Sequence, residues 1–122
     1  MRRNLGFVFL ALIILVGCGE AKEIASLKSA AIAGCPVNIG KMVDAYMGEP
    51  EWGSGSHPEG ALVTVSGKVR YGNRSASAVL EFVYREDNTF FAKSLHINGQ
   101  AQAKDIMTQM LKLMCVAASQ VQ

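Results

Sequence analysis

The sequence has few of the residues from which catalytic and metal-binding motifs are built. Its 122 residues include only two histidines, three cysteines, three prolines and one tryptophan. No CxxC pair or Cys/His cluster is present, which argues against a zinc site. There is also no His-Glu-x-x-His, P-loop or dinucleotide fingerprint. We therefore expect no metal and no cofactor.

An excess of charge of one sign is lacking as well. Charged residues make up 18% of the chain, with twelve Lys and Arg against ten Asp and Glu. Two of the arginines, Arg2 and Arg3, fall in an N-terminal leader that we expect to be removed, so the rest of the chain is balanced. A balanced chain gives no electrostatic footprint for nucleic acid. We expect no nucleic-acid partner.

The N-terminus has the parts of a bacterial export signal. Arg2 and Arg3 form a positive region, and residues 5–16 form an apolar run. A helix needs about 20 residues to span a bilayer, so this run is too short and is typical of a secretory signal. It ends in Leu-Val-Gly-Cys at 15–18, which resembles the lipobox of bacterial lipoprotein precursors.

The lipobox resemblance implies that diacylglycerol is linked to Cys18 and that residues 1–17 are cleaved off as the signal peptide. Two or more acyl chains hold a protein stably to a membrane. Gly19 and Glu20 follow the cysteine, and by the same resemblance the absence of Asp favours the outer membrane over the inner one. Two alternatives stay open: cleavage after Ala31-Ile32-Ala33, far beyond the apolar run, and an uncleaved anchor.

Beyond the anchor, the sequence divides into a tether, a folded part and a tail. Residues 18–34 are rich in Ala, Lys, Glu and Ser. We interpret them as a lipidated and partly helical tether that lifts the domain off the membrane. Residues 35–116 carry the periodic patterns of a small α+β domain. Residues 117–122 show no pattern and are taken as a tail.

The folded part is predicted to contain two helices around a meander. Asn38 can cap a first helix, which Gly48 and Pro50 stop. Residues 52–60 are predicted to form a loop, with a short strand at its start as the alternative. Period-two alternation predicts strands over 61–71, 75–85 and 90–97, and the spacing of apolar residues predicts a second helix over 104–115. Short turns between the strands make them antiparallel. We therefore expect an α+β fold, with a three- to four-stranded meander and the N- and C-terminal helices on one face.

Two cysteines remain once Cys18 is assigned to lipid. Cys35 precedes the first helix and Cys115 ends the last one. An even pair in an oxidising compartment predicts a disulfide. The alternative is two free or buried thiols.

Residues that could carry chemistry do not form a recognisable catalytic set. His57 lies in a Gly/Ser stretch and His96 in the last strand, without the third group that would orient a nucleophile and its base. Glu49, Glu51 and Glu59 surround Trp52, a combination known from sugar-cleaving sites. We interpret these residues as a solvated acidic loop with a packed indole. We also assign the five methionines at helical spacing to the core: Met42, Met47, Met107, Met110 and Met114.

The strand alternation gives one candidate binding face. Lys68, Arg70 and Arg85 share a parity opposite to the apolar stripe, so they are predicted on the outer side of the sheet. This face is a possible site for an envelope protein or another anionic envelope component. An ordinary wetted sheet face is the alternative.

The last two thirds of the chain resembles small exported bacterial proteins of unknown function. The resemblance lies in residues 63–67, 72–73, 95–99 and 114–115 and implies no activity. We expect a membrane-anchored envelope lipoprotein that acts as a non-enzymatic binding module. A periplasmic inhibitor that plugs an enzyme cleft with residues 52–60 is the alternative, and an enzyme is the third reading.

Overall fold

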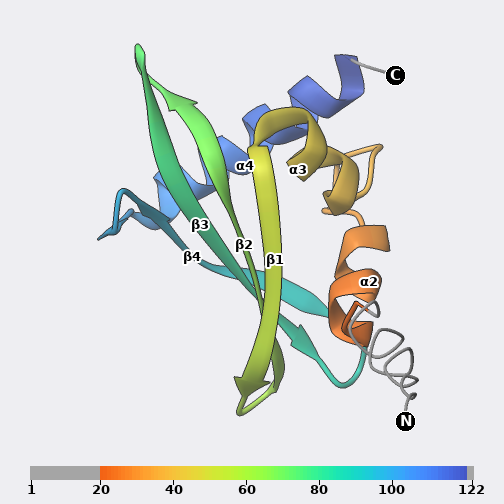
Figure 1. Cartoon of the computed structure of the whole chain (residues 1–122). Coiled ribbons are helices and arrows are strands. Elements are labelled where there is room, and N and C mark those ends of the chain that lie inside the picture. The colour runs from red at the N-terminus through yellow and green to blue at the C-terminus, as the bar shows by residue number, and fades with distance from the viewer. Residues whose placement is uncertain (1–19, 121–122) are drawn as a thin grey trace, which may run out of the picture.

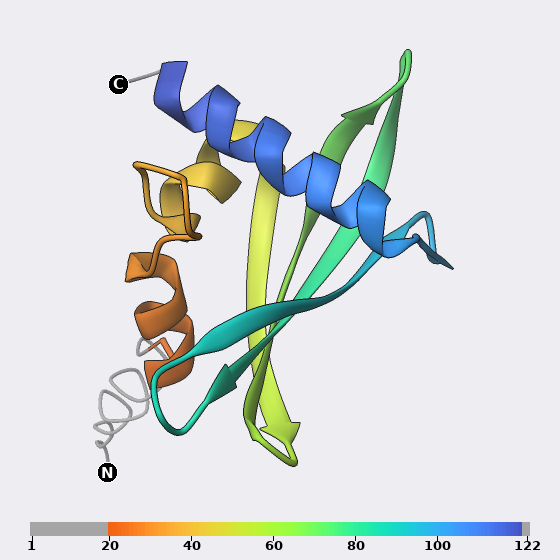
Figure 2. The ribbon, with the colours of Figure 1, turned by 180° about the vertical axis from the view of Figure 1, so that it is seen from behind.

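The computed structural model describes residues 20–120, in which helices pack on one side of a twisted antiparallel sheet (Figures 1 and 2). The sheet has the strand order β1-β2-β3-β4-β5, which is also the chain order. The predicted α+β meander is therefore confirmed, with five strands instead of three to four. The elements are the helices α2 Lys22–Ser29, α3 Ile39–Tyr46 and α4 Lys104–Gln120, and the strands β1 Gly48–His57, β2 Gly60–Tyr71, β3 Arg74–Arg85, β4 Phe90–Ile97 and β5 Gln100–Ala101.

The alternating pattern of β2 and β3 buries one side of the sheet. Val63 and Val65 of β2 lie opposite Phe82 and Leu80 of β3, and all four are buried. Their neighbours along each strand point to the outer face, because successive strand side chains alternate. Gly72 has a φ of +68° in the turn between these strands, a conformation that glycine adopts without strain.

The segment predicted as a loop over residues 52–60 is instead mostly strand β1 and the turn that follows it. Residues 51–57 pair in regular antiparallel register with residues 60–66 of β2. Trp52 lies opposite Val65 on the inner face, and Lys28 Nζ lies 5.1 Å from the centroid of the indole ring. The prediction failed because Gly, Ser and Pro are depleted in strands, whereas here the neighbouring strand imposes the extended conformation.

The predicted tether over residues 18–34 is also corrected. Residues 22–29 form helix α2, whose Ile24 and Leu27 belong to the same hydrophobic core as the sheet. Leu27 is fully buried. The described part of this segment is thus an integral layer of the domain, while Cys18 and the signal peptide at 1–17 lie outside the described residues.

The two helices that were predicted are both present. The Asn38 side chain accepts a hydrogen bond of 2.8 Å from the Lys41 backbone N–H, as expected of a helix cap. Helix α4 continues to Gln120, five residues past its predicted end and through most of the supposed tail. Ala118 is buried there, so the core stripe of α4 extends one turn beyond Met114. All five assigned methionines are buried, as predicted.

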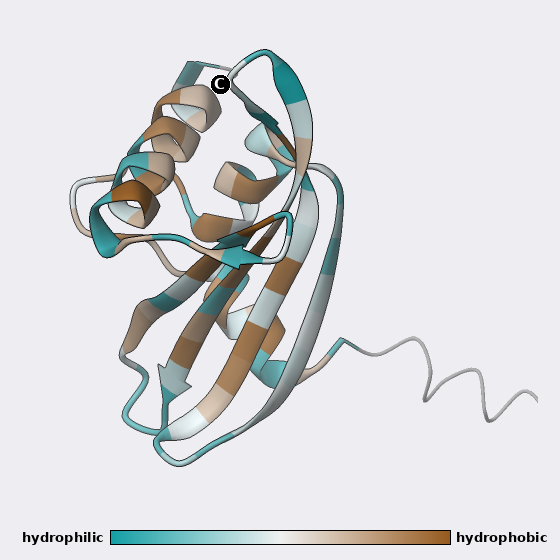
Figure 3. Cartoon of the chain, turned by 90° about the vertical axis from the view of Figure 1, so that its left-hand side faces the viewer, coloured by the Kyte–Doolittle hydropathy of each residue, from teal (hydrophilic) through white to brown (hydrophobic). Residues whose placement is uncertain are grey.

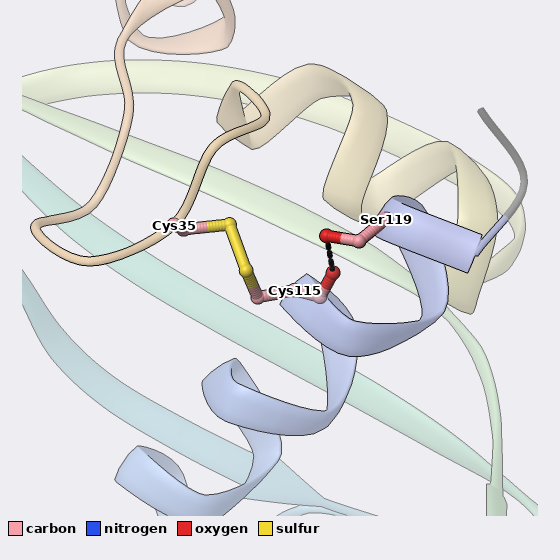
Figure 4. The surroundings of a disulfide bond; sticks show 3 residues. All are labelled: Cys35, Cys115 and Ser119. Atoms are coloured by element: carbon pink, nitrogen blue, oxygen red, sulfur yellow. Dashed lines mark hydrogen bonds between the residues drawn. A yellow bond between two sulfur atoms is a disulfide. The ribbon is translucent and has the colours of Figure 1, made fainter.

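A disulfide joins the loop before α3 to the last third of α4 (Figure 4). It links Cys35 to Cys115, with their Cα atoms 6.0 Å apart and 80 positions separating them in sequence. The predicted bond is therefore confirmed. One turn further along α4, Ser119 Oγ donates a hydrogen bond of 2.9 Å to the Cys115 carbonyl oxygen.

The packing of α2 predicts a large effect of a single truncation. Leu27→Ala should lower the free energy of unfolding by about 2–5 kcal/mol, because it opens a cavity in the core. Lys22→Ala, on the exposed side of the same helix, should change it by less than about 0.5 kcal/mol. Urea unfolding of the two variants checks this. Equal, small effects would mean that α2 is a tether after all.

Candidate functional site

The three basic residues predicted on one face do lie on the outer side of the sheet, but at different ends. Lys68 lies opposite Ser77 of β3, and Arg70 lies opposite Ser75, close to the Gly72 turn. Arg85 lies at the far end of β3, eight residues beyond Ser77. At about 3.3 Å per residue this is roughly 25 Å along the strand. Lys68 and Arg70 can act together, and Arg85 cannot join them.

Arg85 is occupied by contacts within the domain. Its Nε donates a 2.7 Å hydrogen bond to Glu59 Oε1, and its guanidinium carbon lies 4.6 Å from the centroid of the Phe91 ring. Phe91 lies opposite Val83, whose side chain is fully buried although it belongs to the outer face. Arg85 therefore covers a small apolar row on the outside of the sheet and is a structural residue.

The turn that follows Arg85 is held by local hydrogen bonds. Thr89 donates to Asp87 Oδ1 both from its hydroxyl, at 2.6 Å, and from its backbone N–H, at 3.0 Å. The hydroxyl bond, followed by the backbone bond, lowers the pKa of the Asp87 carboxyl below its usual range. Because Asp87 is an exposed turn residue, we assign these bonds to the geometry of the turn and not to a reaction.

The three acidic residues around Trp52 are not all brought together, although Glu49 and Glu51 line one hollow. Glu49 and Glu51 lie at one end of β1, and Glu59 lies beyond the other end, next to Arg85. The His57 ring accepts a hydrogen bond of 3.1 Å at Nδ1 from the Glu59 backbone N–H, which stabilises the turn between β1 and β2. His96 lies on the outer face opposite Val79. Neither histidine contacts a nucleophile among the described residues.

The two ends of the sheet differ in the turns and charges that they carry. The proximal end holds the first turn of α2, the β1–β2 turn and the β3–β4 turn, which line a common hollow that includes Lys22, Gly60 and Asn88. The distal end holds the β2–β3 turn (Figure 1). Acidic residues predominate at the proximal end: Glu20, Glu23, Glu59, Glu86 and Asp87.

The β2–β3 hairpin of the distal end carries basic and apolar side chains together, and Glu49 and Glu51 lie next to it in a hollow that Lys68 also lines. Arg70 and Arg74 are exposed, and neither forms an ion pair within the described residues. Tyr71 is 51% exposed and lines a groove of about 320 Å³ between the hairpin and α4. Leu113 of α4 lines the same groove and is 55% exposed.

The exposed side of α4 continues this surface. Val116 follows Leu113 by one helical turn and is 53% exposed. We call Arg70, Tyr71, Arg74, Leu113 and Val116 the distal surface. Val116 also borders a second, largely apolar groove of about 560 Å³ beside the disulfide, which Ile32 and Leu111 line as well.

Sequence reasoning missed the apolar part of the distal surface. The inward stripe of α4 is Met107, Met110 and Met114, and Leu113 and Val116 fall outside it. These two residues therefore form a second apolar stripe on a helix that needs only one for the core. That surplus was visible in the sequence and corresponds to the exposed apolar side chains of α4.

Comparison with known proteins identifies no relative: no family model, no curated protein and no solved structure matches this chain. Within residues 20–120, no group of three or more His, Cys, Asp or Glu side chains is arranged to hold a metal ion. None of the helices in that range combines the length and hydropathy that crossing a membrane requires.

The two kinds of basic residue predict different effects on stability. Arg85→Ala should lower the free energy of unfolding by about 1 kcal/mol, because it removes a surface ion pair and a cation–π contact. Lys68→Ala and Arg70→Ala should each change it by less than about 0.5 kcal/mol. Urea titrations monitored by circular dichroism give the three values. Three equal values would contradict the assignment of Arg85 to the scaffold.

Proposed function

We propose that this chain is a lipid-anchored interaction module of the bacterial cell envelope, without enzymatic activity, which docks an acidic partner protein on the distal surface. The observation that carries the proposal is the exposure of Tyr71 and Leu113 in the groove that Arg70 also lines, with Arg74 opposite Tyr71 and Val116 one helical turn beyond Leu113. A contiguous set of exposed large apolar side chains in a small domain marks an interaction site.

The proposed anchor fits the position of α2. Cys18 precedes the first residue of α2, Lys22, by four positions, which span at most about 14 Å even when fully extended. A lipid on Cys18 would therefore hold the proximal end close to the membrane. The outer membrane remains the favoured location under the lipobox resemblance, with the domain facing the periplasm or the surface.

The charge distribution supports the same orientation. An acidic proximal end gains nothing from anionic lipid headgroups, so its attachment would depend on the acyl chains. The basic β2–β3 hairpin would then face away from the membrane, where a partner can reach it. Arg70 and Arg74 would meet carboxylates of the partner, and the apolar groove between the hairpin and α4 would receive its hydrophobic side chain.

We favour a binding module over an inhibitor that would insert residues 52–60 into an enzyme cleft. Most of that segment is paired strand, and Trp52 faces the core. We also favour a binding module over an enzyme. Glu59 is paired with Arg85 at the opposite end of β1 from Glu49 and Glu51, so it cannot act with them on one bond.

The anchor and the docking surface are tested in one expression system. Wild-type chain should incorporate labelled palmitate, and Cys18→Ala should leave an unprocessed and unlabelled precursor. For docking, a photo-cross-linking residue at Leu113 should form an adduct with one protein in intact cells. The double variant Arg70→Glu/Arg74→Glu should reduce this adduct at least about tenfold, a loss that corresponds to about 1.4 kcal/mol.

The matched control reverses the same number of charges outside the distal surface. Lys22→Glu/Lys41→Glu should leave the adduct unchanged, because both lysines are exposed and neither lines the groove. Palmitate in the Cys18 variant would overturn the anchor. An adduct that is equally sensitive to both double variants, or absent in the wild type, would overturn the docking surface.

A further inference from the structure

Over residues 52–57, the outer edge of β1 lacks the protection that the opposite edge of the sheet has. A free edge presents a row of unpaired N–H and C=O groups, which proteins usually shield with short strands, Lys, Pro or bulges. Strand β5, at the opposite edge, has only two residues. Strand β1 has ten, with Pro50 and an irregularity between Gly48 and Glu51 at its start. Residues 52–57 carry no Lys, Arg or Pro, and β1 is the outermost strand in Figure 3.

Gly53 and Gly55 leave the outer face of β1 without side chains at these two positions. Gly55 has no positive φ, and a Cβ at this position would meet no atom within 4 Å. At Gly53 the only neighbour would be Thr64 Oγ1, at 3.2 Å. The fold therefore does not require glycine at position 55, although glycine within a strand weakens it. Glycine in a strand is common where another backbone approaches closely.

We propose that residues 52–57 receive an extended segment of a partner protein, which adds to the sheet as a sixth strand beside β1. The hydrogen-bonding groups of a free edge match those of another extended backbone, and this determines the class of ligand. The half-buried Trp52 offers an apolar neighbour to a side chain on the inner face of such a segment. This site lies on a different edge of the molecule from the distal surface.

Charge indicates where the segment carries its basic residues. Glu49 and Glu51 are exposed at the start of β1, and neither forms an ion pair within the described residues. At the other end of the strand, Glu59 is already paired with Arg85. The segment therefore carries Lys or Arg at the end that lies beside Glu49 and Glu51, and uncharged residues along the rest.

A second copy of this chain fits the edge less well than a partner segment does. Two β1 edges related by a two-fold axis in a continuous sheet would run antiparallel. The proximal ends of the two copies would then point in opposite directions. If Cys18 carries lipid, both proximal ends must face one membrane, so the exclusion of self-pairing rests on the proposed function.

The test measures amide hydrogen exchange of the mature lipidated chain in nanodiscs of phosphatidylethanolamine and phosphatidylglycerol. The probe is a ten-residue peptide of alternating Val and Thr that begins and ends with Lys. At about ten times its dissociation constant it should slow the exchange of alternate amides in residues 52–57 by about tenfold. The same peptide with Pro at alternate positions should give no protection, because proline cannot donate to the ladder.

Matched variants decide between the edge and a general effect. Gly55→Lys places a shielding charge where the structure has room for it and should abolish the protection. Ser75→Lys, which adds the same charge on the outer face of central strand β3 and away from the hollow of Glu49 and Glu51, should keep it, as should Arg70→Glu/Arg74→Glu. Retained protection in Gly55→Lys, or no protection in the wild type, would overturn the proposal. If protection rises with protein concentration in the absence of peptide, the edge pairs with a second copy of the chain and the proposal is overturned. The palmitate experiment tests the anchor separately.

Discussion

The disulfide between Cys35 and Cys115 is the constraint on which the placement of α4 depends. Helix α4 packs mainly against α3 and reaches the sheet chiefly at β4. The bond ties its C-terminal part to the loop that precedes α3, across 80 positions of sequence. Closing a loop of that length stabilises the folded state by up to about 4.5 kcal/mol. That is a large share of the roughly 5–15 kcal/mol by which domains are stable.

The position of α4 in turn creates the distal surface. With Met107, Met110 and Met114 directed into the core, Leu113 and Val116 must face outward, since they lie on another side of the helix. The β2–β3 hairpin extends to the same end, which brings Tyr71 into one groove with Leu113. A covalent bond at one side of α4 thus fixes a contact surface at the other.

The elements that could be predicted from the sequence are those in which apolar residues recur regularly. Strands β2 and β3 and helix α4 show such a pattern because each buries one continuous side in the core. Strand β1 was missed because Gly, Ser and Pro carry no such stripe, and its extended form comes from pairing with β2. Helix α2 was read as a tether because only Ile24 and Leu27 secure it.

The candidate site was predictable in part for a related reason. Strand parity correctly placed Lys68, Arg70 and Arg85 on the outer face, but parity does not measure distance along a strand. The register of β2 against β3 separates Arg85 from Lys68 and Arg70. Arg85 instead contacts Glu59 and Phe91. Only the arrangement of the hairpin against α4 joins Arg70 to apolar neighbours, and that is a property of the fold.

The central claim is that an anchored domain holds its acidic proximal end at the membrane and its distal surface away from it. Spin labels at Glu86→Cys and Asn73→Cys, in lipidated protein bound to vesicles with nickel-chelating headgroups, measure this most directly. The two ends of β2 are about 40 Å apart for twelve residues of strand. The account predicts strong relaxation of the label at position 86 and almost none at position 73. Equal relaxation of the two labels, or the reverse order, would contradict it.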